Sequence, residues 1–150
     1  LKYRRNVSMG GAFASQMVPF VKSLNWQIDV VIPIPLGRKR YKERGYNQVG
    51  MIAKPLALAL DMRYAPKGLM RRKETRSQVG LTKAERKVNV QNAFQAGKGI
   101  NGKSVLIMDD VSTTGSTLSA GAEVLYSAGA REVYALTVAR ALPQHGLEHA

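Results

Sequence analysis

Apolar and polar positions along the chain predict three helices and three strands. Helical spacing of apolar residues predicts helices over 11–24, about 46–60 and 116–128. Apolar runs rich in β-branched residues predict strands over 28–34, 104–108 and 132–139. Pro33 and Pro35 should stop the first strand, Pro55 should kink the second helix or delay its start, and Gly129 should cap the third. Strands separated by helices predict an α/β fold, with a mostly parallel sheet flanked by helices on both faces.

Residues 105–117 read VLIMDDVSTTGST and carry the clearest chemistry in the chain. Four apolar residues suit a strand buried on both faces, and the pattern becomes helical after Gly115. A strand-to-helix turn presents unpaired amides that suit a phosphate, and here hydroxyls add donors at Ser112, Thr113, Thr114, Ser116 and Thr117. Asp109 and Asp110 would repel a phosphate but suit sugar hydroxyls, so the inferred ligand is a sugar phosphate. The alternative is a capped helix after a buried strand, with both acids solvated.

This run resembles the phosphoribosyl-diphosphate (PRPP) motif of type I phosphoribosyltransferases. The family pattern is four apolar residues, two acids, two mostly apolar residues and Thr-Thr-Gly-x-Thr, from which Ser112 departs mildly. The resemblance implies a type I phosphoribosyltransferase-like (Rossmann-like) fold. It implies that Asp109 and Asp110 bind the ribose. The loop around the 5-phosphate would comprise Val111, Ser112, Thr113, Thr114, Gly115, Ser116 and Thr117.

A narrower resemblance, to the ComF family associated with DNA uptake in competent bacteria, covers nearly the whole chain. It rests on Leu1-Lys2-Tyr3, on VIPIPLGRKRYKERGYNQ over 31–48, on Arg76, Gln78, Leu81, Arg86 and Asn89-Val90, and on Thr137-Val138-Ala139-Arg140. Family members often carry an N-terminal cysteine-rich, zinc-binding segment, which this cysteine-free sequence lacks. We therefore interpret the chain as truncated, with one phosphoribosyltransferase-like domain over 1–146 and a tag remnant or tail over 147–150.

Composition narrows the class of protein further. The 150 residues suffice for one compact core, and no apolar run is long enough to cross a bilayer or to serve as a signal sequence. We therefore expect no membrane partner and a cytoplasmic location. The absence of cysteine excludes disulfides and thiolate metal sites in this portion of the protein. The two histidines, His145 and His149, both lie near the end of the chain, so we do not expect a histidine metal site.

Two segments hold most of the net charge of +13. Residues 38–44 carry five basic residues against one glutamate, and residues 67–87 carry eight against two. Both are polar breaks between predicted elements, so both can be loops that reach a common site. A single arginine or lysine there, such as Arg71, Arg72 or Lys73, is interpreted as a solvated surface charge.

The family resemblance gives these segments roles toward an anionic ligand. A loop after the first core strand binds diphosphate in type I enzymes, which implies Pro35, Leu36, Gly37 and Arg38. A second, often basic loop closes over the diphosphate, which implies that Arg76 and Arg86 stabilise it as a leaving group. Mg²⁺ would bridge diphosphate and ribose oxygens, bound through the ligand with help from Asp109 and Asp110. A homodimer is a frequent state of such enzymes.

Three functional hypotheses stay open. The first is a phosphoribosyltransferase acting on an unidentified acceptor, with nitrogen as the expected nucleophile. Residues 1–25 and the tail after Arg140 are candidates for recognising that acceptor, but neither carries a diagnostic pattern. The second is a non-catalytic PRPP-binding module. The third is an accessory protein of DNA uptake that interacts with single-stranded DNA or a helicase, since basic segments with Tyr41 and Tyr46 also suit nucleic acid.

Overall fold

A computed structural model describes residues 2–37, 42–43, 47–72, 82, 84, 93–112 and 114–140. The elements, in chain order, are α1 (Lys2–Ser23), β1 (Val30–Pro33), α3 (Gln48–Ala59), β2 (Arg63–Tyr64), β3 (Leu69–Arg71), β4 (Phe94–Ala96), β5 (Ser104–Ser112), α5 (Ser116–Ser127) and β6 (Glu132–Arg140). In this part of the chain, no helix is both long and apolar enough to cross a membrane.

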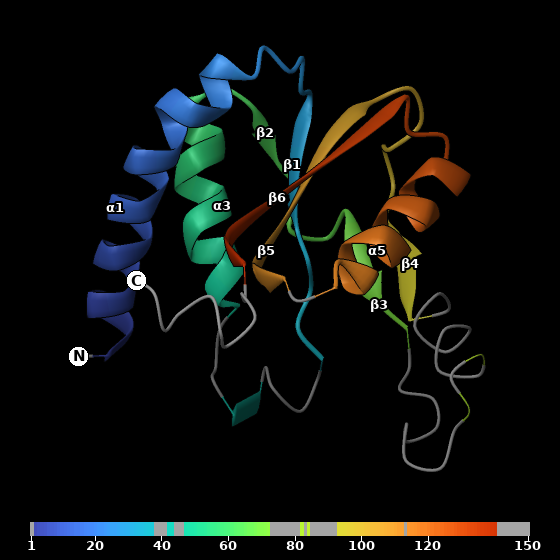
Figure 1. The fold of residues 1–150 in the computed structure, drawn as a ribbon, viewed down its shortest axis with the longest axis horizontal. Helices are drawn as coiled ribbons and strands as arrows, with labels where there is room; N and C mark the ends of the chain where they lie inside the picture. Colours follow the sequence, from blue (N-terminus) through green and yellow to red (C-terminus); the bar gives the residue numbers. More distant parts are fainter. Residues whose placement is uncertain are drawn as a thin grey trace, which may run out of the picture.

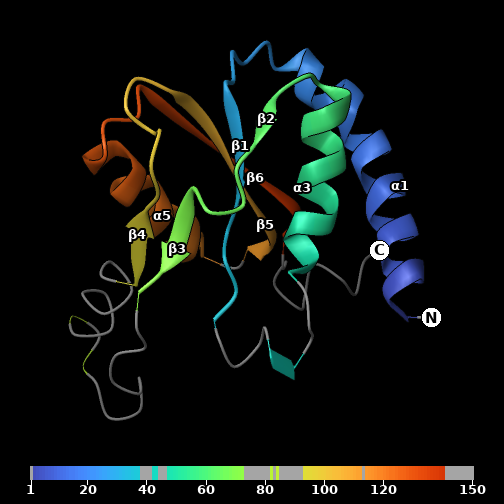
Figure 2. The same ribbon diagram turned by 180° about the vertical axis from the view of Figure 1, so that it is seen from behind.

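Four strands form a parallel sheet in the order β2-β1-β5-β6. The registers place Val31 beside both Tyr64 of β2 and Leu106 of β5, and Leu106 beside Tyr134 of β6. Strands β3 and β4 form a separate antiparallel hairpin that lies beside α5 (Figures 1 and 2). The predicted α/β fold with a parallel sheet is therefore confirmed.

Helices cover both faces of the sheet, as predicted (Figure 1). Alternate residues of a strand point to opposite faces, so β5 supplies two cores at once. Leu106 and Met108 pack with α1 and α3, while Val105 and Ile107 pack with α5 and the hairpin. All four side chains are fully buried, which explains the continuous apolar run that predicted this strand.

Helix α1 packs closely along α3 (Figures 1 and 2). A Cβ atom at Gly10 would collide with the carbonyl oxygen of Met51, so the two backbones approach at this point as only glycine permits. The helix begins at Lys2, earlier than the predicted Gly11, because the polar first turns lack the apolar spacing on which the prediction relied.

The other elements differ from prediction mainly at their ends. Strand β1 is shorter than predicted, whereas β5 continues to Ser112 because it stays paired with β6 as far as Arg140. Helix α3 starts at Gln48, close to the predicted start, and contains Pro55 in its interior, so the late start expected from this proline is wrong. Gly129 follows α5 with a φ of 96°, the left-handed conformation expected at a helix C-terminus. The short strands β2, β3 and β4 were not predicted, since two or three residues carry no periodicity.

Candidate functional site

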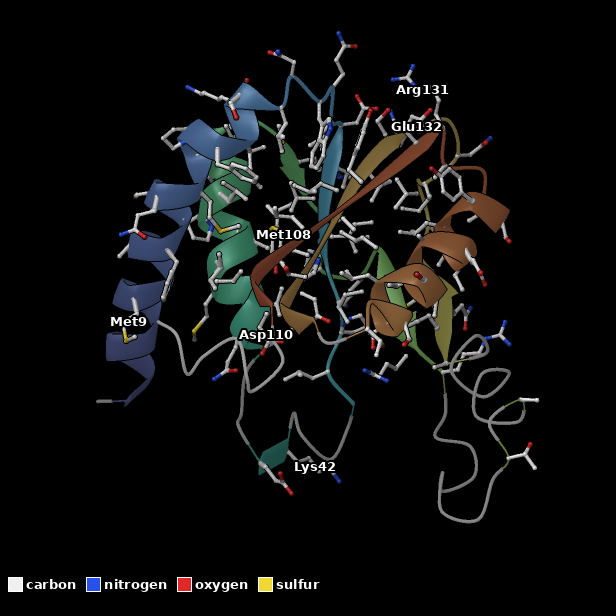
Figure 3. The ribbon with its side chains drawn as sticks, viewed as in Figure 1. Met9, Lys42, Met108, Asp110, Arg131 and Glu132 are labelled. Carbon is white, nitrogen blue, oxygen red and sulfur yellow. The ribbon has the colours of Figure 1, made fainter. Side chains whose placement is uncertain are left out.

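The sheet has a switch point between β1 and β5. The chain leaves β1 through α3 and returns beside it as β2, whereas it leaves β5 through α5 and returns on the opposite side as β6. Ligands of open parallel sheets bind in the crevice that such diverging connections leave at the carboxyl ends of the strands. Asp110 lies at this end, opposite Arg131 and Glu132 at the other (Figure 3). The predicted site residues that the structure describes therefore border a topological binding position.

The two carboxylates lie within the last part of β5. Asp109 pairs with Thr137 of β6, and the backbone amide of Asp110 donates to Asp109 Oδ1 over 2.9 Å. Strand alternation puts Asp109 on the α5 side with Ile107, and Asp110 on the α3 side with Met108. The prediction that both acids belong to the strand-to-helix turn is wrong, because the ladder to β6 continues past them.

Asp109 has a perturbed acidity. Burial raises the pKa of its carboxyl, and the neighbouring Asp110 carboxyl raises it further. The Asp110 amide and the positive charge of Arg71 oppose this by lowering the pKa. A half-buried carboxylate held between a like and an opposite charge is typical of binding and catalytic sites, although ion-pair networks produce it too.

The start of α5 has the features expected of a phosphate site. Gly115 is its N-cap, with a φ of 81° and no side chain to cap the helix amides. The amide of Ser116 donates to Thr114 Oγ1 over 3.3 Å, and the two hydroxyls of these residues hydrogen bond to each other. By contrast, the Asn47 side chain caps α3 by accepting from the Val49 amide. Of the predicted 5-phosphate loop, Val111 and Ser112 belong to β5, and Thr113 lies outside the described residues.

The segment after β1 is held by three elements. The amide of Ile34 donates to the Met108 carbonyl over 2.8 Å. The carbonyl of Ile34 accepts from Asn47 Nδ2 over 3.1 Å. The carbonyl of Pro35 accepts from Arg71 Nε over 2.8 Å. The predicted diphosphate loop residues Pro35, Leu36 and Gly37 thus directly follow a residue that is bonded to β5, and Arg38 falls outside the described residues.

Arg71 is exposed, as the sequence predicts, but it also makes specific contacts. Besides its bond to Pro35 it lies over the Phe94 ring, 5.1 Å from the centroid. The missed signal is structural: Arg71 and Phe94 meet only because β3 pairs with β4, strands too short to predict. Asn47 was likewise missed, since a cap residue gives no sign of its distant partner Ile34.

The two basic segments lie largely outside the described residues. Arg76 and Arg86 lie outside the described residues, so their roles stay predictions. Lys42, from the first basic segment, lies toward the same end of the molecule as Asp110 (Figure 3). Over the described ranges, no group of three or more histidine, cysteine, aspartate or glutamate side chains is arranged to hold a metal ion.

Residues 20–148 match the family of the phosphoribosyl transferase domain. The chain belongs to this family. It is also 35% identical to the DNA utilization protein YhgH of Escherichia coli O6:H1 over 114 residues, which are 76% of this chain and 50% of that protein. Competence protein F of Haemophilus influenzae is 35% identical over 75% of this chain and 51% of its own length. The chain therefore spans about half the length of these curated relatives, and the predicted ComF resemblance is confirmed.

Solved structures show the same fold. The glutamine PRPP amidotransferase from B. subtilis, complexed with ADP and GMP, superimposes with a TM-score of 0.57 at 24% identity, over 90% of this chain and 26% of that one. A hypoxanthine phosphoribosyltransferase from Staphylococcus aureus gives a TM-score of 0.51 at 14% identity, over 92% of this chain and 76% of that one. At these identities the likeness establishes the type I phosphoribosyltransferase fold.

Proposed function

We propose that this chain binds PRPP at the carboxyl ends of β1 and β5 and transfers its phosphoribosyl group to an acceptor nitrogen. The observation that carries the proposal is the meeting of three features at one switch point. These are the carboxylates of Asp109 and Asp110, the glycine-capped start of α5, and the loop after β1. Membership of the phosphoribosyl transferase domain family supports it.

Each feature suits one part of PRPP. Ionised Asp109 and Asp110 accept hydrogen bonds from the ribose hydroxyls, and the amides and hydroxyls around Gly115 donate to the 5-phosphate. The loop 35–37 then faces the diphosphate. In the transfer, the bond between ribose C1 and diphosphate oxygen breaks with its electron pair on oxygen. The acceptor nitrogen bonds to C1 and then loses a proton.

The protein's part in this reaction is mainly electrostatic. Charge builds on the leaving diphosphate, and cations held close to it lower the barrier where water is excluded. In the proposal, Arg76 and Arg86 provide this charge from the second basic segment. No side chain needs to act as a strong base, because an amine or nucleobase nitrogen attacks through its own lone pair.

The donor set near the ribose also fits Mg²⁺. Aspartate oxygens are hard ligands of the kind this ion prefers, and Asp109 and Asp110 supply them. Because the proposal places two carboxylates there, the ligand's own oxygens would complete the coordination. Bound Mg²⁺ would neutralise charge on the diphosphate and so ease its departure.

The names of the curated relatives favour a second candidate function. DNA utilization and competence proteins suggest that this chain acts in the handling of DNA, as a PRPP-binding or DNA-interacting accessory protein. A net charge of +13 supports contacts with DNA phosphates. Salt-sensitive binding of single-stranded DNA that survives loss of Asp109 and Asp110 would favour this function, since those carboxylates should not contact phosphates.

Calorimetric titration with PRPP and Mg²⁺ tests the main proposal. The variant Asp109→Asn/Asp110→Asn keeps the shape of both side chains and removes both charges. Hydrogen bonds to charged groups contribute about 1.5–3 kcal/mol each. Each lost bond should therefore weaken binding by about tenfold to more than a hundredfold. A folded wild type that does not bind PRPP would refute the proposal.

A matched control is available at the other end of the sheet. Asp61 is exposed and has a φ of 55°, a left-handed conformation that asparagine tolerates well. Asp61→Asn therefore makes the same chemical change at one carboxylate, without strain, and it should bind PRPP like the wild type. Equal losses from Asp61→Asn and from the double variant would mean that the loss is not specific to the proposed site. A pure net-charge effect would have the opposite sign, because removing a negative charge from the protein favours binding of an anion.

A further inference from the structure

The backbone that opens the loop after β1 has few hydrogen-bonding groups of its own. Pro33 and Pro35 lack amide protons, so between them only Ile34 donates, and it donates to Met108 of β5. The carbonyls of Ile34 and Pro35 accept from two side chains, Asn47 and Arg71. Each of these groups therefore has a partner, and the path of the loop depends on two side chains from distant parts of the sequence.

The two-stranded sheet of β3 and β4 holds the Arg71 side chain in place. It pairs across the hairpin with Phe94, whose side chain is buried, and its guanidinium lies over that ring. The amide of the next residue, Arg72, donates to the Ala93 carbonyl over 2.7 Å, so the ladder of the hairpin extends one residue beyond Arg71. A stacked guanidinium on a paired strand loses little further freedom when it donates to Pro35.

The same guanidinium acts on the proposed ribose site. Its positive charge lowers the pKa of Asp109 against the opposing effects of burial and Asp110. Arg71 thus connects β3 to the loop after β1 by a hydrogen bond and to β5 by charge. These two neighbours are the segments that the proposed function assigns to diphosphate and to ribose.

We propose that Arg71 is a positioning residue, which holds the loop 35–37 in the conformation that accepts the diphosphate of PRPP. The inference rests on the proposed function and adds a determinant of ligand choice. A loop held in advance pays less ordering entropy when it binds, so Arg71 should favour PRPP over ribose 5-phosphate, which lacks the diphosphate. The 5-phosphate site at the start of α5 involves none of these bonds to the loop.

The test compares both ligands in calorimetric titrations with Mg²⁺. Arg71→Met keeps an apolar chain over Phe94 but removes the charge and the donor to Pro35. We expect PRPP affinity to fall about tenfold or more, the effect of losing one charge-assisted hydrogen bond, while ribose 5-phosphate affinity changes about twofold or less. Arg71→Lys keeps the charge but lacks the planar fork, so it should restore PRPP binding only in part.

The control variant is Arg72→Met, which removes the same charge from the next exposed residue and should leave the ratio of the two affinities unchanged. Thermal denaturation of each variant reports any general loss of structure. Equal losses of both ligands in Arg71→Met, with lowered stability, would overturn the positioning role and leave a structural one. Unchanged affinities would overturn it as well. A wild type that binds neither ligand would instead refute the proposed function, and this inference with it.

Discussion

The neighbouring glycines Gly10 and Gly11 of α1 allow a sharp test of how this helix packs. Both lie inside the same helix, so replacing either by alanine gains the same helix propensity, about 1 kcal/mol. A Cβ at Gly11 meets no atom within 4 Å. A Cβ at Gly10 would collide with the Met51 carbonyl oxygen and lie 2.9 Å from its carbonyl carbon. Backbone atoms inside α3 cannot move aside as a flexible side chain can.

The two substitutions should therefore differ in their effect on stability. Gly11→Ala should stabilise the chain by about 1 kcal/mol. Gly10→Ala should lose that gain to overpacking, which typically costs about 1–3 kcal/mol. The difference between the two variants, about 1–3 kcal/mol, isolates the contact with Met51, because propensity and unfolded-state entropy cancel between neighbouring glycines.

Urea denaturation measures this difference. With a slope of about 2 kcal/mol per molar urea, Gly11→Ala should raise the midpoint by about 0.5 M, and Gly10→Ala should lower it or leave it unchanged. The slopes should agree among the three proteins, which confirms that only stability has changed. A Gly10→Ala variant as stable as Gly11→Ala would refute the close packing of α1 on α3.

Two further predictions concern the site without ligand. Because burial raises the pKa of Asp109, this group contributes stability below its unfolded pKa of about 4 that is lost as pH rises through the folded pKa. Asp109→Asn should therefore be at least as stable as the wild type at neutral pH, and this advantage should shrink at acidic pH. Thermal denaturation at neutral and at acidic pH measures the difference, and a lower melting temperature of the variant at neutral pH would contradict the prediction. Asn47→Ala removes the cap of α3 and the bond to Ile34, and should lower stability by about 1 kcal/mol or more in urea denaturation. An unchanged midpoint would mean that neither bond matters.

Much of the fold could be predicted because its main signals are local. The run over 105–108 is apolar on both faces since β5 is central and covered on both sides, so sequence alone identified a buried strand. Apolar spacing predicted the start of α5 after Gly115, and Gly129 predicted its end because the left-handed backbone after a helix favours glycine. The charged and hydroxylated residues after Met108 predicted the ligand class in the same way, from residue types that lie together in the chain.

Tertiary structure decided what depends on distant residues. The hairpin β3–β4 joins segments separated by more than twenty residues, and its short strands have no periodic pattern. Arg71 could therefore not be distinguished from its basic neighbours until pairing placed it over Phe94 and beside Pro35. The length of β5 also depended on its partner, because β5 stays paired with β6 beyond Met108, where the sequence predicted that the strand would end. The sequence by itself determined which functional side chains the chain carries. The order of the strands determined which of these side chains lie together, because strand pairing depends on contacts between distant residues that no local pattern reveals.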